Sequence, residues 1–539
     1  MDKHYIYDRI EILLNKAQTL KEKSFEDIYG EFEYTEVGKI VSEIHRYVEE
    51  LCQEQSIMNG VQQIESVEAS MRNIQKLALE NNNEVYKKIE YELVPLIKNM
   101  RMYFYYFIFI YPDKDKMKKY FENEVEKYFD NPYVEESKRT GRYKYDLSIV
   151  IIAYNKLEYT KVCVGYLLKY LPSKIRYELI LMNHGSTDGT KEYFEQLNFD
   201  KTINIAVNGG GIQIIDRIVE GRYVLKISND VIVLNNVIEN MYQCITSNEK
   251  IAWVVATTPN VSNQQDIFGE ISDMEEIFRI AAINNVSNER RWEEKIRLCN
   301  PIDMYDIEKT LEIIGRLLTN GPGVLFSDDR QSALYRRAGY KMYLAKDSYC
   351  YHFGSVTIKD NMENERECFR KGRIEYLKEY GIDPWGYGFV YDSKLFCNLE
   401  IEKQGKVNIL GINSGLCANI VKLRDSFKEV LGNKNVWITG FIQSREYELD
   451  VKSLTDEVFL CGDWSFFDQE PTRLYDYILI ENGIEEDLQV LESIYKWKKI
   501  DGEILLRTKN QNIRKKLQEK YLSQEIESIE QNYYWIRIQ

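Results

Sequence analysis

Four short clusters of polar and glycine residues in the middle of the chain carry the side chains best suited to chemistry. They are Tyr154-Asn155, 183–190 (NHGSTDGT), 208–211 (NGGG) and 228–230 (SND). Each stands at or near the carboxyl end of a predicted strand, the edge where an open α/β sheet binds its ligands. Asp230 is a candidate ligand for a hard divalent cation, because Mg²⁺ commonly takes one or two protein carboxylates and completes its shell with other oxygens. A glycine-rich turn by itself is more often only a turn, so the order and spacing of the clusters carry the prediction.

The elements that must position these clusters are short β-branched runs at 147–153 (LSIVIIA), 178–182 (ELILM) and 223–228 (YVLKIS). They alternate with helical stretches, which predicts an α/β layer fold. The residues before them carry apolar side chains at three- and four-residue spacing up to a break at Asn131-Pro132. That spacing predicts an α-helical segment.

A second series of strands begins near residue 405. It comprises the runs 407–410, 436–439, 458–461, 476–480 and 503–507, which amphipathic stretches separate. This pattern predicts a second, smaller Rossmann-like layer. We therefore predict three domains: a helical domain at 1–141, an α/β domain at 142–400 and a Rossmann-like domain at 401–539.

The overall composition disfavours several classes of protein. With 71 basic and 86 acidic residues, the formal net charge is −15, so we expect no nucleic-acid partner. The nine cysteines are scattered without a Cys-x-x-Cys pair, which favours a reducing compartment. The longest charge-free apolar run, 102–111, covers ten residues, whereas a helix needs ~20 to span a bilayer. Since the N-terminus carries no readable leader, we expect a cytoplasmic chain without a membrane span.

In their order, the four clusters resemble family 2 glycosyltransferases of the GT-A fold. In that family a strand ends in Tyr-Asn, and Asp-Asp/Asn-Gly-Ser-x-Asp-Gly-Thr, Asn-x-Gly and an Asp-x-Asp-like motif follow. Downstream, 322–355 is similar to the acidic acceptor motif of the family and to its His-x-x-Gly-Ser-like stretch. The resemblance covers roughly 145–360. It implies a GT-A core, a Rossmann-like nucleotide-diphospho-sugar transferase, between an N-terminal all-helical domain and a C-terminal Rossmann-like domain.

The resemblance also implies which residues bind the nucleotide-diphosphate sugar. They are Tyr154, Asn183, His184, Asn208, Gly209, Asn229 and Asp230. Asn183 and His184 replace an acidic pair of the family, and Ser228 replaces the first Asp of the Asp-x-Asp slot. Amide and imidazole groups still hydrogen-bond a pyrimidine edge. The nucleobase therefore stays open, and a UDP-sugar is the donor that we expect.

A divalent metal, Mn²⁺ or Mg²⁺, is implied at Asp230 and His352. Of the four histidines in the chain, His184 and His352 fall within the proposed site, and imidazole suits Mn²⁺ tolerably. A structural alternative stays open for each: His352 as a residue packed under the sheet, and His184 as a turn residue with unusual dihedrals.

The same resemblance places the catalytic carboxylate in FSDDR, at Asp328 or Asp329, with Asp328 the first choice. Transfer with inversion needs a base that takes the acceptor's proton, while the sugar passes through an oxocarbenium-like state. One of the two acids is alternatively a cap of the following helix. Asp188 is favoured as a helix cap over a ligand.

The function that follows is an inverting, metal-dependent glycosyltransferase acting on a hydroxyl acceptor. Large flanking domains favour a macromolecular acceptor, such as a bacterial surface or flagellar protein, by analogy with modular relatives. A growing saccharide is the rival acceptor. A non-catalytic scaffold and an S-adenosylmethionine-dependent methyltransferase remain alternatives for the whole chain.

The last alternative comes from 405–510, which resembles class I S-adenosylmethionine methyltransferases. VNILGINSGLCANIV is similar to their first cofactor turn, with Gly411, Gly415 and Asp463 kept. Ile409 and Asn413 stand where the family has an acid and a glycine. Because backbone must approach the cofactor closely there, we favour a degenerate, non-catalytic domain.

Overall fold

A computed structural model gives the fold. It describes residues 3–33, 36–55, 60–89, 93–105, 121–122, 140–205, 215–269, 271, 273–310, 313, 326–354, 365–484 and 488–539. The chain divides into two compact units. The first consists of Met1–Ser287, Cys299–Tyr335 and Ala345–Gly381, and the second of Asn288–Leu298, Arg336–Leu344 and Ile382–Gln539. The second unit thus takes short segments from the middle of the chain as well as the C-terminal part.

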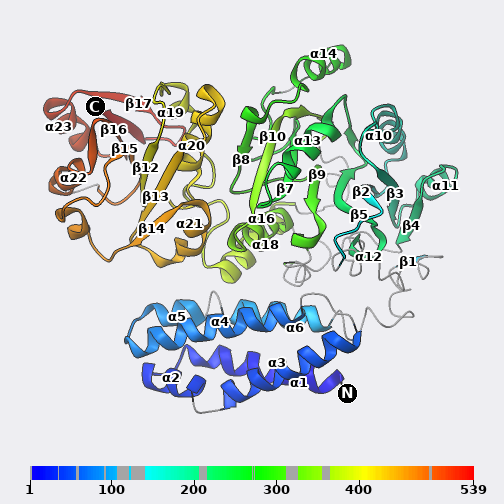
Figure 1. Cartoon of the computed structure of the whole chain (residues 1–539), viewed down its shortest axis with the longest axis horizontal. Helices are drawn as coiled ribbons and strands as arrows, with labels where there is room; N and C mark the ends of the chain where they lie inside the picture. The colour runs from blue at the N-terminus through cyan, green and yellow to red at the C-terminus, as the bar shows by residue number, and fades with distance from the viewer. Residues whose placement is uncertain are drawn as a thin grey trace. The chain divides into compact units, whose positions relative to one another are not determined.

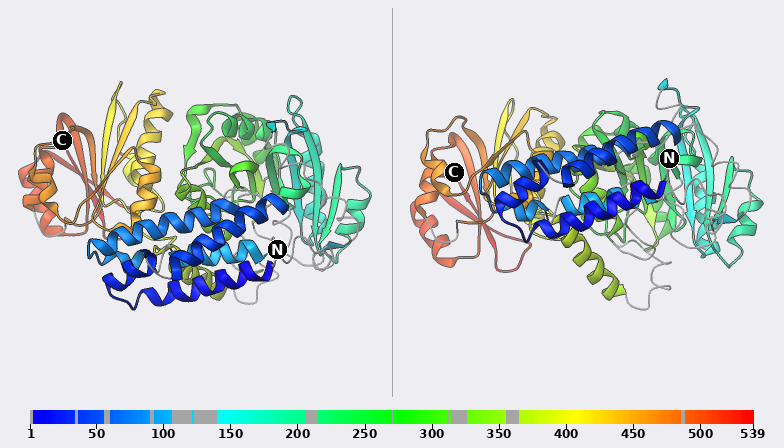
Figure 2. Two further views of the ribbon diagram at one scale, coloured as in Figure 1. Left: turned by 60° about the horizontal axis from the view of Figure 1, so that its bottom comes forward. Right: turned by 90° about the horizontal axis from the view of Figure 1, so that it is seen from below.

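The described N-terminal residues are helical, as the apolar spacing predicts. The helices are α1 (Lys3–Leu20), α2 (Phe25–Glu33), α3 (Glu36–Gln55), α4 (Gly60–Leu79), α5 (Glu84–Lys88) and α6 (Val94–Tyr105). They run side by side in both views of Figure 2. Ile10, Leu13 and Ala17 of α1 are fully buried, where α1 packs on α3 and α6. One apolar stripe per helix therefore forms the core of this segment.

A mixed sheet follows, in the order β1-β4-β3-β2-β5-β9-β7-β10-β8 (Figure 1). Its strands are β1 (Phe121–Glu122), β2 (Tyr145–Ala153), β3 (Tyr177–His184), β4 (Lys201–Ile205), β5 (Gly221–Ser228), β7 (Ile251–Thr257), β8 (Trp292–Glu294), β9 (Ile302–Asp306) and β10 (Lys341–Tyr349). Strands β4, β3, β2 and β5 are parallel, and β9 pairs antiparallel with β5 and β7. The three strands predicted at 147–153, 178–182 and 223–228 are confirmed, in a GT-A-like mixed sheet core.

Helices and one small ladder connect these strands. The helices are α10 (Leu157–Lys169), α11 (Thr190–Glu195), α12 (Ile215–Ile218), α13 (Val237–Thr246), α14 (Met274–Asn284), α16 (Ser327–Arg337) and α18 (Glu365–Tyr380). The ladder joins β6 (Val231–Ile232) to β11 (Tyr351–His352). All seven residues of β7 are buried, as expected for a sheet covered on both faces.

The C-terminal part forms a second α/β sheet, in the order β14-β13-β12-β15-β16-β18-β17. Its strands are β12 (Val407–Ile412), β13 (Val436–Ile442), β14 (Glu457–Leu460), β15 (Tyr475–Ile480), β16 (Lys498–Thr508), β17 (Ser523–Glu527) and β18 (Tyr534–Ile538). The first five are mutually parallel, and β18 is antiparallel to both of its neighbours. All five predicted strands are present.

Helices accompany this second sheet. They are α19 (Ser393–Cys397), α20 (Ala418–Leu431), α21 (Glu448–Leu454), α22 (Leu488–Tyr495) and α23 (Gln511–Lys520), with short 3₁₀ turns η4 (Glu289–Arg291), η5 (Arg445–Tyr447) and η6 (Trp464–Asp468). A continuous core of buried apolar side chains, among them Ile478, Leu506 and Ile536, runs through β15, β16 and β18. Among all the residues that the structure describes, no helix is long and apolar enough to cross a membrane.

Candidate active site

The loops at the carboxyl ends of β2 and β3 are built by their own polar side chains. The Asn155 amide donates to the Ser186 hydroxyl at 2.8 Å, and the Thr187 amide donates to Asn155 Oδ1 at 2.8 Å. Asn183 accepts from the Ser186 amide at 3.0 Å and donates to Asn204 Oδ1 at 3.0 Å. Asn155 itself has a φ of 54°, a left-handed conformation that asparagine tolerates. These bonds fix the shape of the predicted donor-binding edge.

Asp188 ties the starts of two helices to this edge through hydrogen bonds. Its Oδ2 accepts from the Leu157 amide at 2.8 Å at the start of α10, and its Oδ1 accepts from the Thr190 hydroxyl at 2.6 Å at the start of α11. Burial raises the pKa of Asp188, but these hydrogen bonds outweigh burial and the net pKa is lowered. The carboxylate therefore stays ionised near neutral pH, where it satisfies amides that the helix ends leave unpaired.

Asp230 and His352 come together although they lie far apart in the sequence. Antiparallel pairing of β6 with β11 sets His352 opposite Val231, the residue after Asp230. Asp230 Oδ2 lies 3.3 Å from His352 Nε2, and both side chains are almost fully buried. The Phe353 amide donates to the Asp230 carbonyl at 3.1 Å. Both predicted metal ligands are thus held by backbone pairing at one point.

Two asparagines hold the backbone around this pair. Asn229 is buried and donates through Nδ2 to the Asn155 carbonyl at 2.9 Å and to Thr160 Oγ1 at 2.8 Å. Asn260 donates through Nδ2 to the His352 carbonyl at 3.0 Å. Gly354 has a φ of 93°, and a Cβ there would lie 3.1 Å from the Asn260 side chain. No motif in the sequence pointed to Thr160 or Asn260.

The Asp230 and His352 pair suits a divalent cation chemically. A carboxylate oxygen with an imidazole nitrogen is a ligand set that Mn²⁺ accepts, and Mg²⁺ in nucleotide sites takes few protein ligands. Across the described ranges no three His, Cys, Asp or Glu side chains are grouped to hold a metal. A cation at this pair therefore needs oxygens from a bound molecule or from water.

The other predicted donor residues divide by position. His184 is the buried last residue of β3, in register with Ile205 of β4, and Tyr154 is half-buried directly after β2. Asn208 and Gly209 lie outside the described residues. The roles of these residues in donor binding stay predictions.

The two candidate bases lie in the first turn of α16. Asp328 is half-buried and Asp329 is 5% exposed. The Arg330 amide donates to the Phe326 carbonyl at 3.0 Å, and the Arg330 guanidinium pairs with Glu379 of α18 at 2.9 Å. Carboxylates in a first turn are favoured by the helix dipole. Asp328 is the more accessible of the two acids, as a group that meets an acceptor must be.

The corresponding edge of the C-terminal sheet is closed by side chains of its own loops. Asn413, after β12, donates through Nδ2 to Gln443 Oε1 at 2.8 Å and to the Asn482 carbonyl at 3.2 Å. Its Oδ1 accepts from the Gln443 amide at 3.1 Å. The loops after β12, β13 and β15 are therefore bonded to one another through one asparagine.

The segment before β12 fills the turn that resembles a cofactor loop. The Leu416 amide donates to the Tyr387 carbonyl at 3.1 Å, and a Cβ at Gly415 would lie 2.3 Å from that carbonyl oxygen. The Tyr387 hydroxyl donates to buried Glu481 at 2.5 Å. Burial raises the pKa of Glu481, although hydrogen bonds from Tyr387 and Asn419 lower it in part. Gly415 here makes room for backbone of the same chain.

The remaining cofactor-like residues also have internal roles. Asp463 caps η6 by accepting from the Ser465 amide at 2.9 Å. Trp464 stacks on Phe441 with ring centroids 5.7 Å apart at 18°. A Cβ at Gly411 would lie 2.9 Å from Ile420 of α20, so this glycine permits close packing of helix on strand.

Comparison with known proteins agrees with the geometry of the first sheet. Residues 148–299 match the family model described as Glycosyl transferase family 2. Over 116 residues the chain is 33% identical to "Glycosyltransferase GlyG" of Streptococcus pneumoniae serotype 4, which is 20% of this chain and 37% of that protein. The chain thus spans little more than a third of that relative. Residues 148–299 are therefore a family 2 glycosyltransferase domain.

Two solved structures are also similar to part of the chain. One is GalNAc-T7 with UDP, GalNAc and Mn²⁺, at 12% identity and a TM-score of 0.30, over 39% of this chain and 44% of that one. The other is the mannosyltransferase PcManGT from Pyrobaculum calidifontis with GDP-Man and Mn²⁺, at 14% identity and a TM-score of 0.30, over 48% and 72%. The family match itself contains the clusters from Tyr154 to Asp230, whereas Asp328, Asp329 and His352 lie beyond it.

Proposed function

We propose that the protein transfers a sugar from a nucleotide diphosphate, with UDP as the expected nucleotide, to a hydroxyl acceptor with inversion. The observation that supports this most is the 3.3 Å approach of Asp230 and His352 beside the carboxyl edge of the family 2 domain. A buried carboxylate and an imidazole at such an edge suit a cation that binds a diphosphate.

Each residue has a task in this proposal. Asp230 and His352 would hold the Mn²⁺ or Mg²⁺ ion, which when bound would neutralise charge on the departing diphosphate. Asp328 accepts the proton of the acceptor hydroxyl. The hydroxyl oxygen then forms its bond to the anomeric carbon, and the electron pair of the breaking bond stays on the diphosphate oxygen. Asp329 is the alternative base.

The acceptor is proposed from the size of the chain. Predicted domains at 1–141 and 401–539 flank the transferase domain at 142–400, which is more protein than a small acceptor needs. A protein hydroxyl, such as one on a bacterial surface or flagellar protein, is therefore the acceptor that we propose, and a saccharide is the rival. The choice of a protein acceptor rests on analogy with modular glycosyltransferases of similar fold.

For the C-terminal sheet we propose a methyltransferase-like fold that does not bind S-adenosylmethionine. The resemblance of 405–510 supports the fold, and the observed sheet, which has five parallel strands followed by β18 antiparallel between β16 and β17, is compatible with it. Asn413 and Tyr387 at its carboxyl edge support the loss of binding, because Asn413 is hydrogen-bonded to a neighbouring loop and the Tyr387 carbonyl lies against Gly415. Calorimetric titration of S-adenosylmethionine into the full chain should give no heat, and a saturable heat would contradict this proposal.

Donor binding is the direct test of the transferase. The full chain is unfolded thermally with UDP-glucose, UDP-N-acetylglucosamine, UDP-galactose or GDP-mannose, each with Mn²⁺, Mg²⁺ or chelator. A donor at one hundred times its dissociation constant should raise stability by about 2.7 kcal/mol, and chelator should remove the gain. No thermal shift with any donor would favour the non-catalytic scaffold. The best structural support for that alternative is the Asn183 side chain, which is hydrogen-bonded to Asn204 and Ser186 of the same chain.

A further inference from the structure

The last turn of α16 carries an arginine pair that a single buried carboxylate binds. Arg336 Nε donates to Asp450 Oδ1 at 2.7 Å, and an Arg337 guanidinium nitrogen donates to Asp450 Oδ2 at 2.8 Å. Asp450 belongs to α21 and has no exposed surface, and Arg336 is 3% exposed. All three residues lie in the second compact unit.

This carboxylate is ionised in spite of its burial. Burial raises the pKa of Asp450, but the charges of Arg336 and Arg337 outweigh that effect and the net pKa is lowered. Arg336 also donates to the Ile296 carbonyl, so it is fixed on two sides. Removal of one partner from such a buried group leaves a charge without compensation, which is strongly unfavourable.

The same helix carries the candidate base residues at its other end. Asp329 and Arg336 are seven residues apart, which in an α-helix returns to the same face after two turns. The turns between them are packed, with Ala333 and Tyr335 fully buried. A hydrogen-bonded helix moves as one body, so an anchor at its last turn also sets the position of its first.

We propose that Asp450 is a positioning residue that anchors α16 through Arg336 and Arg337 and thereby places Asp328 for proton abstraction. The C-terminal part of the chain then contributes to sugar transfer through α16. This inference rests on the proposed function, because Asp328 is the base only in that proposal.

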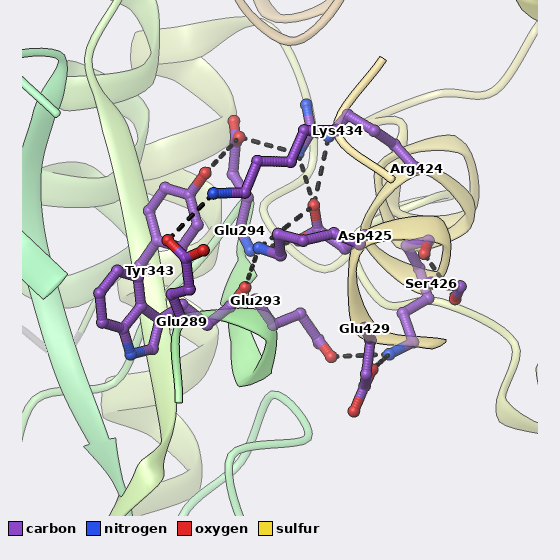
Figure 3. Close-up of polar contacts among 12 residues, drawn as sticks. Glu289, Glu293, Glu294, Tyr343, Arg424, Asp425, Ser426, Glu429 and Lys434 are labelled. Carbon is purple, nitrogen blue, oxygen red and sulfur yellow. Dashed lines mark hydrogen bonds and ion pairs between the residues drawn. The ribbon is translucent and has the colours of Figure 1, made fainter. Parts of the chain in front are cut away.

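A second buried cluster in the same unit provides the matched control (Figure 3). There Arg424 donates to Glu294 Oε2 at 2.8 Å, and the Glu294 amide donates to Asp425 Oδ2 at 2.5 Å. Asp425 is buried like Asp450, but it binds the Glu294 amide of β8 and the side chains of Arg424 and Lys428 of α20. Asp425→Asn therefore removes an equivalent buried charge without releasing that helix.

The test uses the full chain, Mn²⁺ and the UDP-sugar that stabilises it, and measures release of UDP as the sugar is transferred to water. Asp450→Asn should lower kcat ~10²-fold, the effect of about 1 Å of misplacement, and leave the donor KM within about twofold, since the donor ligands are untouched. Asp450→Glu should restore part of kcat, and Asp425→Asn should keep it. If Asp450→Asn does not fold, Arg337→Gln replaces it in the test, because this variant removes the Arg337 contact with Asp450 and keeps the Arg336 contact.

Hydrogen exchange separates the anchor from the chemistry. Amides of α16 should exchange faster in Asp450→Asn than in the wild type or Asp425→Asn, while amides of β2 and β5 stay protected. Unchanged kcat in Asp450→Asn, or an equal loss in Asp425→Asn, overturns the positioning role. If the amides of α16 exchange at the same rate in Asp450→Asn as in the wild type, Asp450 does not anchor the helix. This measurement needs no enzymatic turnover. Absence of any donor-induced thermal shift in the wild type contradicts the proposed function itself.

Discussion

The carboxyl edges of the two sheets occupy equivalent places in two α/β folds, but their polar side chains have different partners. At the first edge Asp230 and His352 approach one another from two short strands that are distant in the sequence. At the second edge Asn413 joins three loops, and Tyr387 occupies the glycine turn. A parallel sheet offers an edge for a ligand, but the loop side chains decide whether they bind each other or something else.

The largest effect that tests this contrast is expected at Asp328. Asp328→Asn should lower sugar transfer ~10²-fold or more, the usual worth of a positioned base, with the donor-induced thermal shift unchanged. Asp273→Asn is the control, because Asp273 caps α14 and is not among the predicted site residues, and asparagine caps a helix equally well. If Asp329→Asn lowers transfer and Asp328→Asn does not, the base is one residue further along.

A comparable effect on binding is expected at Asp230. Asp230→Asn removes the carboxylate charge next to His352, so the Mn²⁺-dependent part of the donor shift, up to about 2.7 kcal/mol at one hundred times the dissociation constant, should disappear. Thermal unfolding with Mn²⁺ and with chelator measures this. Unchanged turnover in the variant, together with equal shifts in both conditions, would remove the metal from the proposal.

The closed edge of the second sheet is tested by Gly415→Ala. The residue has a φ of +55°, and the new Cβ would meet the Tyr387 carbonyl oxygen at 2.3 Å, so stability should fall by roughly 2 kcal/mol. Gly462→Ala is the matched control, because no atom lies within 4 Å of a Cβ there. Denaturant unfolding compares the two variants. Equal stabilities would mean that the turn is open and that the two edges are alike.

The smallest effect concerns the pH dependence of the first edge. Asp188→Ala should cost about 1 kcal/mol at neutral pH, as for a lost cap. The pKa of Asp188 is lower in the folded state, so its contribution is complete above the ordinary Asp pKa and is lost as pH falls through the folded value. Unfolding at several pH values should show the cost shrinking in acid. Asp188→Asn keeps an acceptor oxygen and should show a smaller cost without this pH dependence.

The strands show which parts of the fold the local sequence pattern predicts. Runs such as 147–153 and 476–480 are dense in β-branched and large apolar residues, and both lie in buried strands. In contrast, β17 has the sequence SQEIE and was not predicted, because only Ile526 of it is buried and its pairing with β18 supplies the structure. Burial alone does not decide which strands the local pattern reveals, because β7 was not predicted either although all seven of its residues are buried.

The site residues divide in the same manner. Asp230 and His352 were predicted as a pair from a resemblance, and the β6–β11 ladder brings them together. Asn183 was predicted to bind the donor, and its amide is engaged by Asn204 and Ser186. A motif names the residue type at a turn, but its hydrogen-bond partner comes from another strand that the motif does not contain.

By itself, the sequence determined the helical N-terminal segment, the two series of strands and the acids and histidines available to the first edge. Those properties follow from periodicity and residue type, which act over a few neighbouring positions. The folded chain adds three contacts that no local pattern contains: Asp230 with His352, the Tyr387 carbonyl with the turn at Gly415, and Asp450 with the end of α16. These contacts join residues far apart in the chain, and burial makes each of them strong enough to matter.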